Sequence, residues 1–199
     1  MTERWNYWTG PDEEDRREKY AKAFREEYQA NGDDVQRRIE AVETAFRSET
    51  DIKLPEGYAS GWRSPAVNEA TQNAGKASKH LFAQAGDKRD TPDGKFAWWC
   101  LRTPHVLEVH GLYMEHPVAT VIRAWRRAHE QGREPTPWCH LQSVPPGSGS
   151  RIYWPDGSAF SEWERFEAEG GYAGITFEAW MATQQQQVRT RAKKPSVDS

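Results

Sequence analysis

The order of apolar patterns along the chain limits the folds that are open to it. Val35, Ile39, Val42 and Phe46 recur every three or four residues, which is typical of one buried helix face. Later apolar stretches such as "LYME" are short, and "WCHLQSV" and "RIYWP" look like paired strands around the loop "PPGSGS". The sequence therefore predicts an α+β fold in which helices flank a small antiparallel sheet.

The domain organisation is predicted from breaks in these patterns. The first 50 residues are expected to form a helical pair packed on the core, with one charged helix over 11–30 and a second over 34–48. The polar, helix-breaking stretch "NGDD" separates the two. Residues 51–182 would form the main domain, and the polar tail 183–199 is expected to be disordered.

Composition and charge exclude several classes of protein. The 199 residues include ten tryptophans, which is enough apolar material for a core, and no apolar run approaches the roughly 18 residues of a membrane-spanning helix. The formal net charge of −3 provides no long-range attraction for nucleic acid. Arg123, Arg126 and Arg127 are expected to lie opposite the apolar face of a helix over 117–131 and to meet solvent.

The N-terminus and the cysteines indicate a compartment. The first 20 residues lack the basic and then apolar layout of a signal peptide, so we expect the protein to be made in the cytoplasm. Two cysteines, Cys100 and Cys139, do not make a disulfide framework, and reduced thiols are expected.

Two separate segments carry side chains that zinc prefers as ligands. His80 and Asp87 lie seven residues apart in "KASKHLFAQAGD", where small intervening residues would let both side chains turn toward one centre. His140 is the natural third ligand, because on a strand it would share a face with Trp138 while Cys139 points the other way. The spacing alone also fits a loop hydrogen bond between His80 and Asp87, and no HExxH motif is present.

Three motifs, in order, give the chain a resemblance to a known family. "SGWRSP" at 60–65, "SKHLFAQAGD" at 78–87 and "WCH" at 138–140 resemble the motifs of the zinc D-alanyl-D-alanine carboxypeptidase family. Members of that family cut bacterial cell-wall peptides, and their fold recurs in hedgehog domains and phage endolysins. The family pattern is Ser-x-His-x-x-Gly-x-Ala-x-Asp, and here Ala83 stands where the family has glycine.

The resemblance implies a role for each matching residue. His80, Asp87 and His140 would be the ligands of a Zn²⁺ ion. Arg63 would steady the substrate carbonyl or the oxyanion that forms on it, and Ser78 would hydrogen-bond substrate or orient His80. The implied substrate is a peptidoglycan stem peptide, cut by a D,D-carboxypeptidase or endopeptidase. The resemblance and the N-terminus together suggest a phage lysis or virion protein that acts on the cell wall.

The proton acceptor is where the chain departs from the family pattern. The best-known members place a glutamate or aspartate three residues before the last histidine, and this chain has Pro137 there. Glu115 in "LYMEHP" is the first substitute and Glu134 the second. If neither carboxylate reaches the site, the alternative is a non-catalytic, zinc-stabilised module that binds cell wall or peptide.

Overall fold

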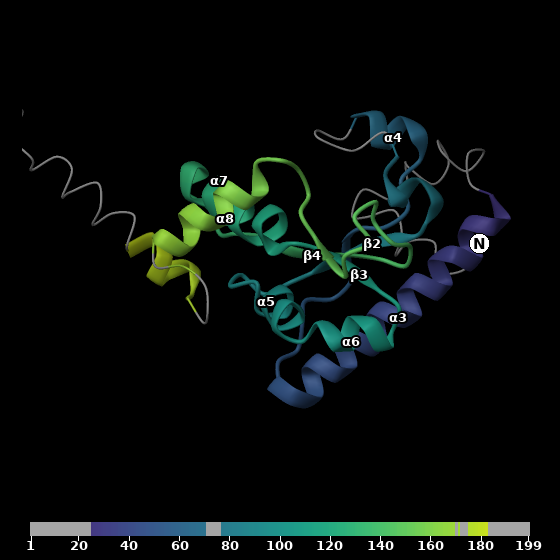
Figure 1. The fold of residues 1–199 in the computed structure, drawn as a ribbon, viewed down its shortest axis with the longest axis horizontal. Helices are drawn as coiled ribbons and strands as arrows, with labels where there is room; N and C mark the ends of the chain where they lie inside the picture. Colours follow the sequence, from purple (N-terminus) through teal and green to yellow (C-terminus); the bar gives the residue numbers. More distant parts are fainter. Residues whose placement is uncertain (1–24, 71–76, 170, 172–174, 183–199) are drawn as a thin grey trace, which may run out of the picture.

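The computed structural model, which describes residues 25–70, 77–169, 171 and 175–182, places helices around one five-stranded sheet (Figure 1). The helices are α3 (Glu26–Thr50), α4 (Pro65–Ala70), α5 (Lys95–Arg102), α6 (Pro104–Val109), α7 (Arg123–Gln131) and α8 (Ala159–Ala168), with a 3-10 helix η2 (Lys79–Phe82) and a π-helix η3 (Val118–Ile122). The strands are β1 (Tyr58–Ser60), β2 (Ala85–Arg89), β3 (Tyr113–Glu115), β4 (Trp138–Gln142) and β5 (Ile152–Tyr153). The predicted α+β class is confirmed.

The sheet has the strand order β1-β2-β4-β3-β5, which does not contain the one strand pairing that the sequence predicted. All neighbours are antiparallel except β3 and β5, which run parallel. The predicted direct pairing of "WCHLQSV" with "RIYWP" is wrong, because Met114 on β3 pairs with Leu141 on one side and with Ile152 on the other. The loop between β4 and β5 is long enough to pass over β3, so closeness in sequence did not decide the partner.

One face of the sheet forms the core against α3. Cys139 and Leu141 on β4 and Met114 on β3 are fully buried on this face. Gly86 on β2 lies so close to α3 that an added Cβ would come within 3.1 Å of the Ile39 side chain. Because side chains alternate along a strand, the neighbours of these residues point to the opposite face, and that face carries the polar residues discussed below.

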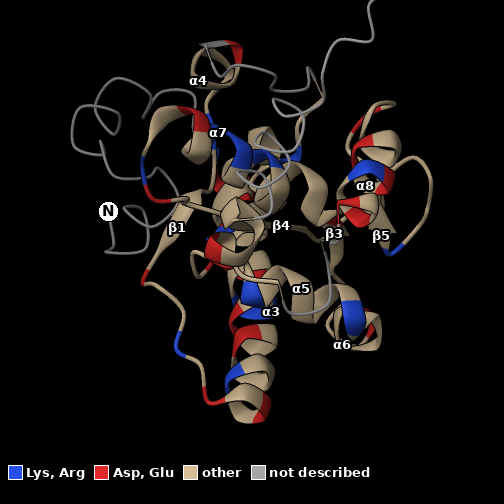
Figure 2. Ribbon diagram, turned by 90° about the vertical axis from the view of Figure 1, so that its left-hand side faces the viewer, with Lys and Arg blue, Asp and Glu red and all other residues tan. Residues whose placement is uncertain are grey.

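The helix α3 corrects the expected break near residue 31. α3 is continuous from Glu26 to Thr50, so the "NGDD" stretch lies within it, while most of the predicted first helix falls outside the described residues. Contacts within and beyond the helix hold this stretch: Asn31 donates to the Phe82 carbonyl at 3.0 Å, and Asp34 forms ion pairs with two arginines one turn later. Figure 2 shows acidic and basic residues interspersed along α3.

Several predicted element boundaries are confirmed. The stretch "KFAWWCLRTPHVLEVHG" forms α5 and α6, which meet at Pro104, and Gly111 after α6 has the left-handed φ of 63°. The helix predicted to follow Pro117 and end before Gly132 forms as η3 and α7. The tail predicted to be disordered lies outside the described residues. No helix in the described part of the chain is both long and apolar enough to cross a bilayer.

Ala83 holds a backbone conformation that favours glycine. It ends η2 with φ 54° and ψ 30°, and its methyl group is buried. This position is where the resembled family has glycine, and the turn here sets the direction of the chain between His80 and Asp87. A left-handed φ costs roughly 1–2 kcal/mol for a residue with a Cβ.

We expect Ala83→Val to lower the free energy of unfolding by about 2 kcal/mol or more, because a β-branched side chain adds left-handed strain and overpacking in a buried site. Ala83→Gly should stay within about 1 kcal/mol of wild type, since relief of strain offsets the lost methyl burial and the greater freedom of the unfolded chain. Urea denaturation measures both. Equal stability of the Val and Gly variants would contradict the assigned turn.

We predict that burial of His116 makes the fold less stable at acidic pH. Its ring lies between Trp154 and Trp163, with centroid distances of 4.1 and 4.7 Å, and burial lowers its pKa to about 4. Since an unfolded histidine has a pKa near 6.5, the unfolded chain takes up the proton first as pH falls, and stability is lost between about pH 6.5 and 4. At pH 4.5 this loss should reach about 2 kcal/mol relative to neutral pH. The variant His116→Phe should lack this component, and parallel stability-versus-pH curves for the two proteins would contradict it.

Candidate metal centre

Three side chains from three elements meet on the polar face of the sheet. His80 on η2, Asp87 on β2 and His140 on β4 each offer one ligand atom, and these atoms lie within 4.8 Å of one another. His80 Nε2 is 3.3 Å from His140 Nδ1 and 3.4 Å from Asp87 Oδ1. Ligands of a tetrahedral zinc ion with bonds of about 2.0–2.1 Å are separated by roughly 3.3 Å, which is close to these two distances.

The register of the sheet brings Asp87 and His140 together. β2 and β4 are antiparallel neighbours in which Asp87 is paired with His140, and paired side chains point to the same face. Asp87 Oδ1 lies 2.7 Å from His140 Nδ1, and a zinc ion bound to Nδ1 would take the place of the proton between these two atoms. This contact is shorter than the edge of a zinc tetrahedron, so a bound ion would separate the two atoms slightly.

The backbone of the "SGWRSP" segment fixes the orientation of His80. Its Nδ1–H donates to the Gly61 carbonyl at 2.6 Å, so Nε2 carries the lone pair that a metal needs. The His80 carbonyl accepts from the Arg63 amide at 3.1 Å, and the Trp62 indole donates to the Leu81 carbonyl at 3.2 Å. These three bonds explain why two motifs some twenty residues apart belong to one site.

Electrostatics within the trio favour a negative carboxylate. Burial alone would raise the pKa of Asp87, but the neighbouring His80 and His140 hold it well below its usual range. Burial lowers the pKa of His80 despite the opposing charge of Asp87. For His140, burial acts to lower the pKa, and the hydrogen bond and charge of Asp87 outweigh it and raise the pKa. An ionised carboxylate and a neutral His80 are the forms that bind zinc.

Arg63 contacts the carboxylate of the candidate ligand Asp87. Its Nη2 donates to Asp87 Oδ2 at 2.8 Å, and its Nε donates to Ser60 Oγ at 2.8 Å. Because Oδ2 is occupied in this way, Oδ1 is the oxygen that faces the two histidines. Arg63 is therefore held beside the site, and its predicted contact with substrate stays a prediction.

Glu115 lies in the same row of the sheet as the candidate ligands. β3 pairs with β4 through Tyr113 with Gln142 and Met114 with Leu141, so the next position in the register sets Glu115 beside His140. On its other side Glu115 is paired with Tyr153 of β5. Burial raises the pKa of Glu115, the charge of His140 acts against this, and the charge of Asp87 adds to it.

The other candidate residues have different positions. Pro137 is buried just before β4, and its carbonyl accepts from the Asp90 amide at 3.1 Å. Glu134 is exposed on the loop between α7 and β4, and no contact joins it to the three candidate ligands within the described residues. Ser78 immediately precedes η2, and its carbonyl accepts from the Leu81 amide at 3.1 Å. Of the two proposed proton acceptors, the fold brings Glu115 to the trio.

Sequence reasoning missed several residues of this face. Gly61 acts through its carbonyl, which no residue pattern reveals. Tyr153 and Arg151 are on β5 or directly before it, and Gln142 is two residues after His140 on β4. Period-2 alternation could have placed Gln142 beside His140 and Arg151 beside Tyr153, but it could not show that the two strands lie on either side of β3.

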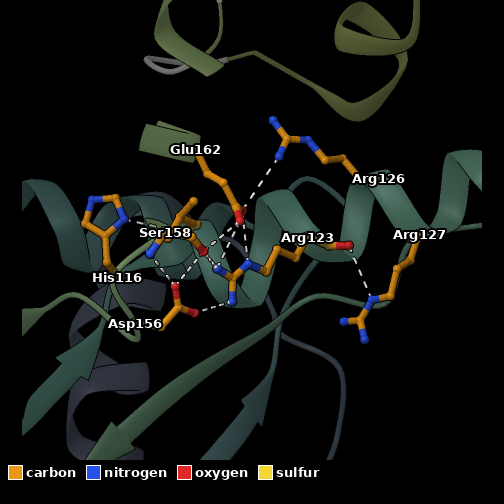
Figure 3. Close-up of polar contacts among 8 residues, drawn as sticks. His116, Arg123, Arg126, Arg127, Asp156, Ser158 and Glu162 are labelled. Carbon is orange, nitrogen blue, oxygen red and sulfur yellow. Dashed lines mark hydrogen bonds and ion pairs between the residues drawn. The ribbon is translucent and has the colours of Figure 1, made fainter. Parts of the chain in front are cut away.

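Two of the arginines of α7, Arg123 and Arg126, lie close to acidic residues. Arg123 donates to Asp156 at 2.8 Å and to both oxygens of Glu162 at 3.0 and 3.1 Å (Figure 3). Arg126 lies 3.6 Å from the same glutamate, whereas Arg127 lies over the Trp138 ring at 5.7 Å. Arg123 keeps 31% of its side chain exposed, so the prediction that this face meets solvent holds for it only in part: α8 and the loop before it supply its acidic partners.

Comparisons of the chain with protein-family models, with curated proteins and with solved structures found no match. The family resemblance therefore rests on the three sequence motifs. What the structure adds is that these motifs meet at one place, and that His80, Asp87 and His140 form a group that could bind a metal ion.

Proposed function

We propose that this protein is a zinc-dependent metallopeptidase that hydrolyses D-amino-acid-containing stem peptides of peptidoglycan, as a D,D-carboxypeptidase or an endopeptidase. The observation that carries the proposal is the convergence of His80 Nε2, Asp87 Oδ1 and His140 Nδ1 from three separate elements. The resembled family supplies the substrate class and the expectation of a phage lysis or virion protein.

The donor set supports zinc as the metal. Two imidazoles and one carboxylate, with a fourth position left for water, form a common ligand set of hydrolytic zinc sites. A zinc ion bound here would act as a Lewis acid and lower the pKa of its water to about 7. His80 donates to the Gly61 carbonyl and Asp87 accepts from Arg63, each on the side away from the trio. Metal ligands generally have such outer hydrogen-bond partners, which fix their orientation.

Glu115 supports hydrolysis over simple metal binding. In this proposal its carboxylate accepts the proton of the attacking water and later delivers a proton to the leaving amine. A carboxylate whose pKa is raised by burial is better matched to both tasks than an exposed one. Its place beside His140 follows from the register of β3 and β4, and so does not depend on the proline that replaces the usual base.

A non-catalytic zinc-stabilised module that binds cell wall or peptide is the competing function. Pro137 favours it, since this residue occupies the position where the best-known relatives carry a carboxylate. The two functions share the metal and differ in whether Glu115 transfers a proton.

Glu115→Gln separates these two functions. On the proposed function, the variant should bind about one zinc per chain and lose roughly 100- to 10,000-fold in kcat, because an amide cannot accept the proton. Release of D-alanine or of new amine from a D-Ala-D-Ala stem peptide measures the rate, and metal analysis measures the zinc. Glu134→Gln is the matched control and should behave as wild type. A zinc-loaded wild type that releases neither product would instead favour the binding module.

A further inference from the structure

A second row of side chains runs beside the candidate metal centre. β4 and β3 pair Gln142 with Tyr113, and the parallel register of β3 and β5 extends this row to Arg151. The row lies two residues along the strands from the one that holds His140 and Glu115, and it is on the same face. No role has been assigned to it so far.

Arg151 is held in place on this face. Its guanidinium lies over the Tyr113 ring, 4.2 Å from the centroid, and its Nη1 donates to the Leu112 carbonyl at 2.8 Å. Stacking on an aromatic ring and one hydrogen bond to backbone fix the planar group while leaving most of its five N–H donors free for another partner.

The charge of Arg151 has no counter-ion in the part of the chain that the structure describes. By contrast, Arg63 forms an ion pair with Asp87 at 2.8 Å, and Arg123 forms ion pairs with Asp156 and Glu162. A partly buried, oriented guanidinium beside a candidate active centre, with no carboxylate of its own, is suited to bind an anion from outside.

Side-chain hydrogen bonds connect the row of Arg151 with the row of His140 and Glu115. The Tyr153 hydroxyl donates to Gln142 Oε1 at 3.0 Å, so its ring spans β3 from β5 to β4. Gln142 Nε2 in turn donates to the Val144 carbonyl at 2.7 Å. These bonds make a fixed floor along which an extended peptide could lie from His140 toward Arg151.

We propose that Arg151 binds a carboxylate of the substrate and thereby selects acidic stem peptides; this inference rests on the proposed function. The guanidinium lies over Tyr113 on β3, which is one strand from His140, two strands from Asp87 and two residues along the strands, so it is roughly 8–12 Å from the metal trio. An extended peptide covers that distance in about two to three residues. The selected carboxylate therefore belongs to a residue two or three positions from the cleaved bond, or to the chain end at that distance.

A set of matched substrates tests this with the zinc-loaded full-length protein. The stem peptide with all carboxylates free is compared with derivatives in which one carboxylate at a time is a carboxamide. For wild type, one derivative should lose roughly 10- to 100-fold in kcat/KM, mainly through KM, because a charge-assisted hydrogen bond is lost without change at the reacting atoms.

The Arg151→Gln variant should cut the peptide with free carboxylates as poorly as wild type cuts the sensitive carboxamide derivative. It should therefore not discriminate between these two peptides. Arg151→Lys should restore part of the discrimination, and Arg47→Gln, an exposed arginine on α3, should leave it unchanged. Thermal melting and zinc content check that each variant is folded and loaded.

Equal cleavage of all the peptides by wild type would overturn the inference while leaving the proposed function standing, as would full discrimination in Arg151→Gln. Cleavage of none of them would overturn the proposed function and this inference with it. The wild-type comparison decides the question even if the arginine variants fail to fold.

Discussion

Replacing His80 with alanine is expected to abolish zinc binding, and with it both zinc-dependent stability and peptide hydrolysis. Wild-type protein should gain about 2.7 kcal/mol of stability at free zinc one hundred times its Kd. For a chain of this size that gain corresponds to a rise in Tm of roughly 5–10 °C. His80→Ala removes one of the three candidate ligands, so its Tm should stay the same with and without zinc.

The control for this experiment is His105→Ala, which removes an exposed histidine on α6 and should keep the full zinc-dependent shift. Differential scanning calorimetry with and without zinc, together with metal analysis, measures the effect. The assigned centre would be refuted by a wild-type protein that binds no zinc, or by a His80→Ala variant with the same shift as wild type.

Replacing Asp90 with alanine should destabilise the fold strongly, because it removes a buried carboxylate that holds three backbone N–H groups. Its buried carboxylate accepts from the backbone N–H groups of Phe96 at 2.9 Å and Ala97 at 2.8 Å in the first turn of α5, and from that of Thr91 at 2.7 Å in the turn before it. Alanine leaves these donors buried without a partner, and each such group costs roughly 1–3 kcal/mol. Burial raises the pKa of Asp90 to about 6, so ionising the carboxyl at neutral pH offsets part of its contribution.

We therefore expect Asp90→Ala to lower the free energy of unfolding by about 3 kcal/mol or more. Asp90→Asn keeps one acceptor oxygen and should lose less. Glu164→Ala, an exposed carboxylate on α8, should stay within about 0.5 kcal/mol of wild type. Urea denaturation at pH 7 gives all three values, and an Asp90→Ala variant as stable as the α8 control would show that the cap is dispensable.

The helices were predictable where their pattern is local. The buried stripe of Val35, Ile39, Val42 and Phe46 and the proline and glycine boundaries of α5, α6 and α7 follow from side-chain spacing and backbone restriction. The expected break at "NGDD" failed because partners elsewhere in the fold, such as the Phe82 carbonyl, outweigh the weak helix propensity of that stretch.

Sheet pairing was less predictable than helix formation. The strands β3, β4 and β5 were predicted from their composition, but β2, which carries Asp87, was not. The partner of β5 was not predicted either, because a strand's hydrogen bonds do not record which neighbour will satisfy them. Because β3 is inserted between β4 and β5, Glu115 lies beside His140, and Arg151 lies on the same face of the sheet.

The sequence by itself determined the candidate ligands. His80, Asp87 and His140 were identified from residue type, alternation and the motifs around them, because the chemistry of a zinc ligand is a property of its side chain. Only the tertiary structure decided which groups surround them. The Gly61 carbonyl orients His80, Glu115 lies next to the trio, and the Arg151 guanidinium lies beyond it. These groups come from strands and loops that are far apart in the chain. Their distances are set by strand register, which is a long-range property.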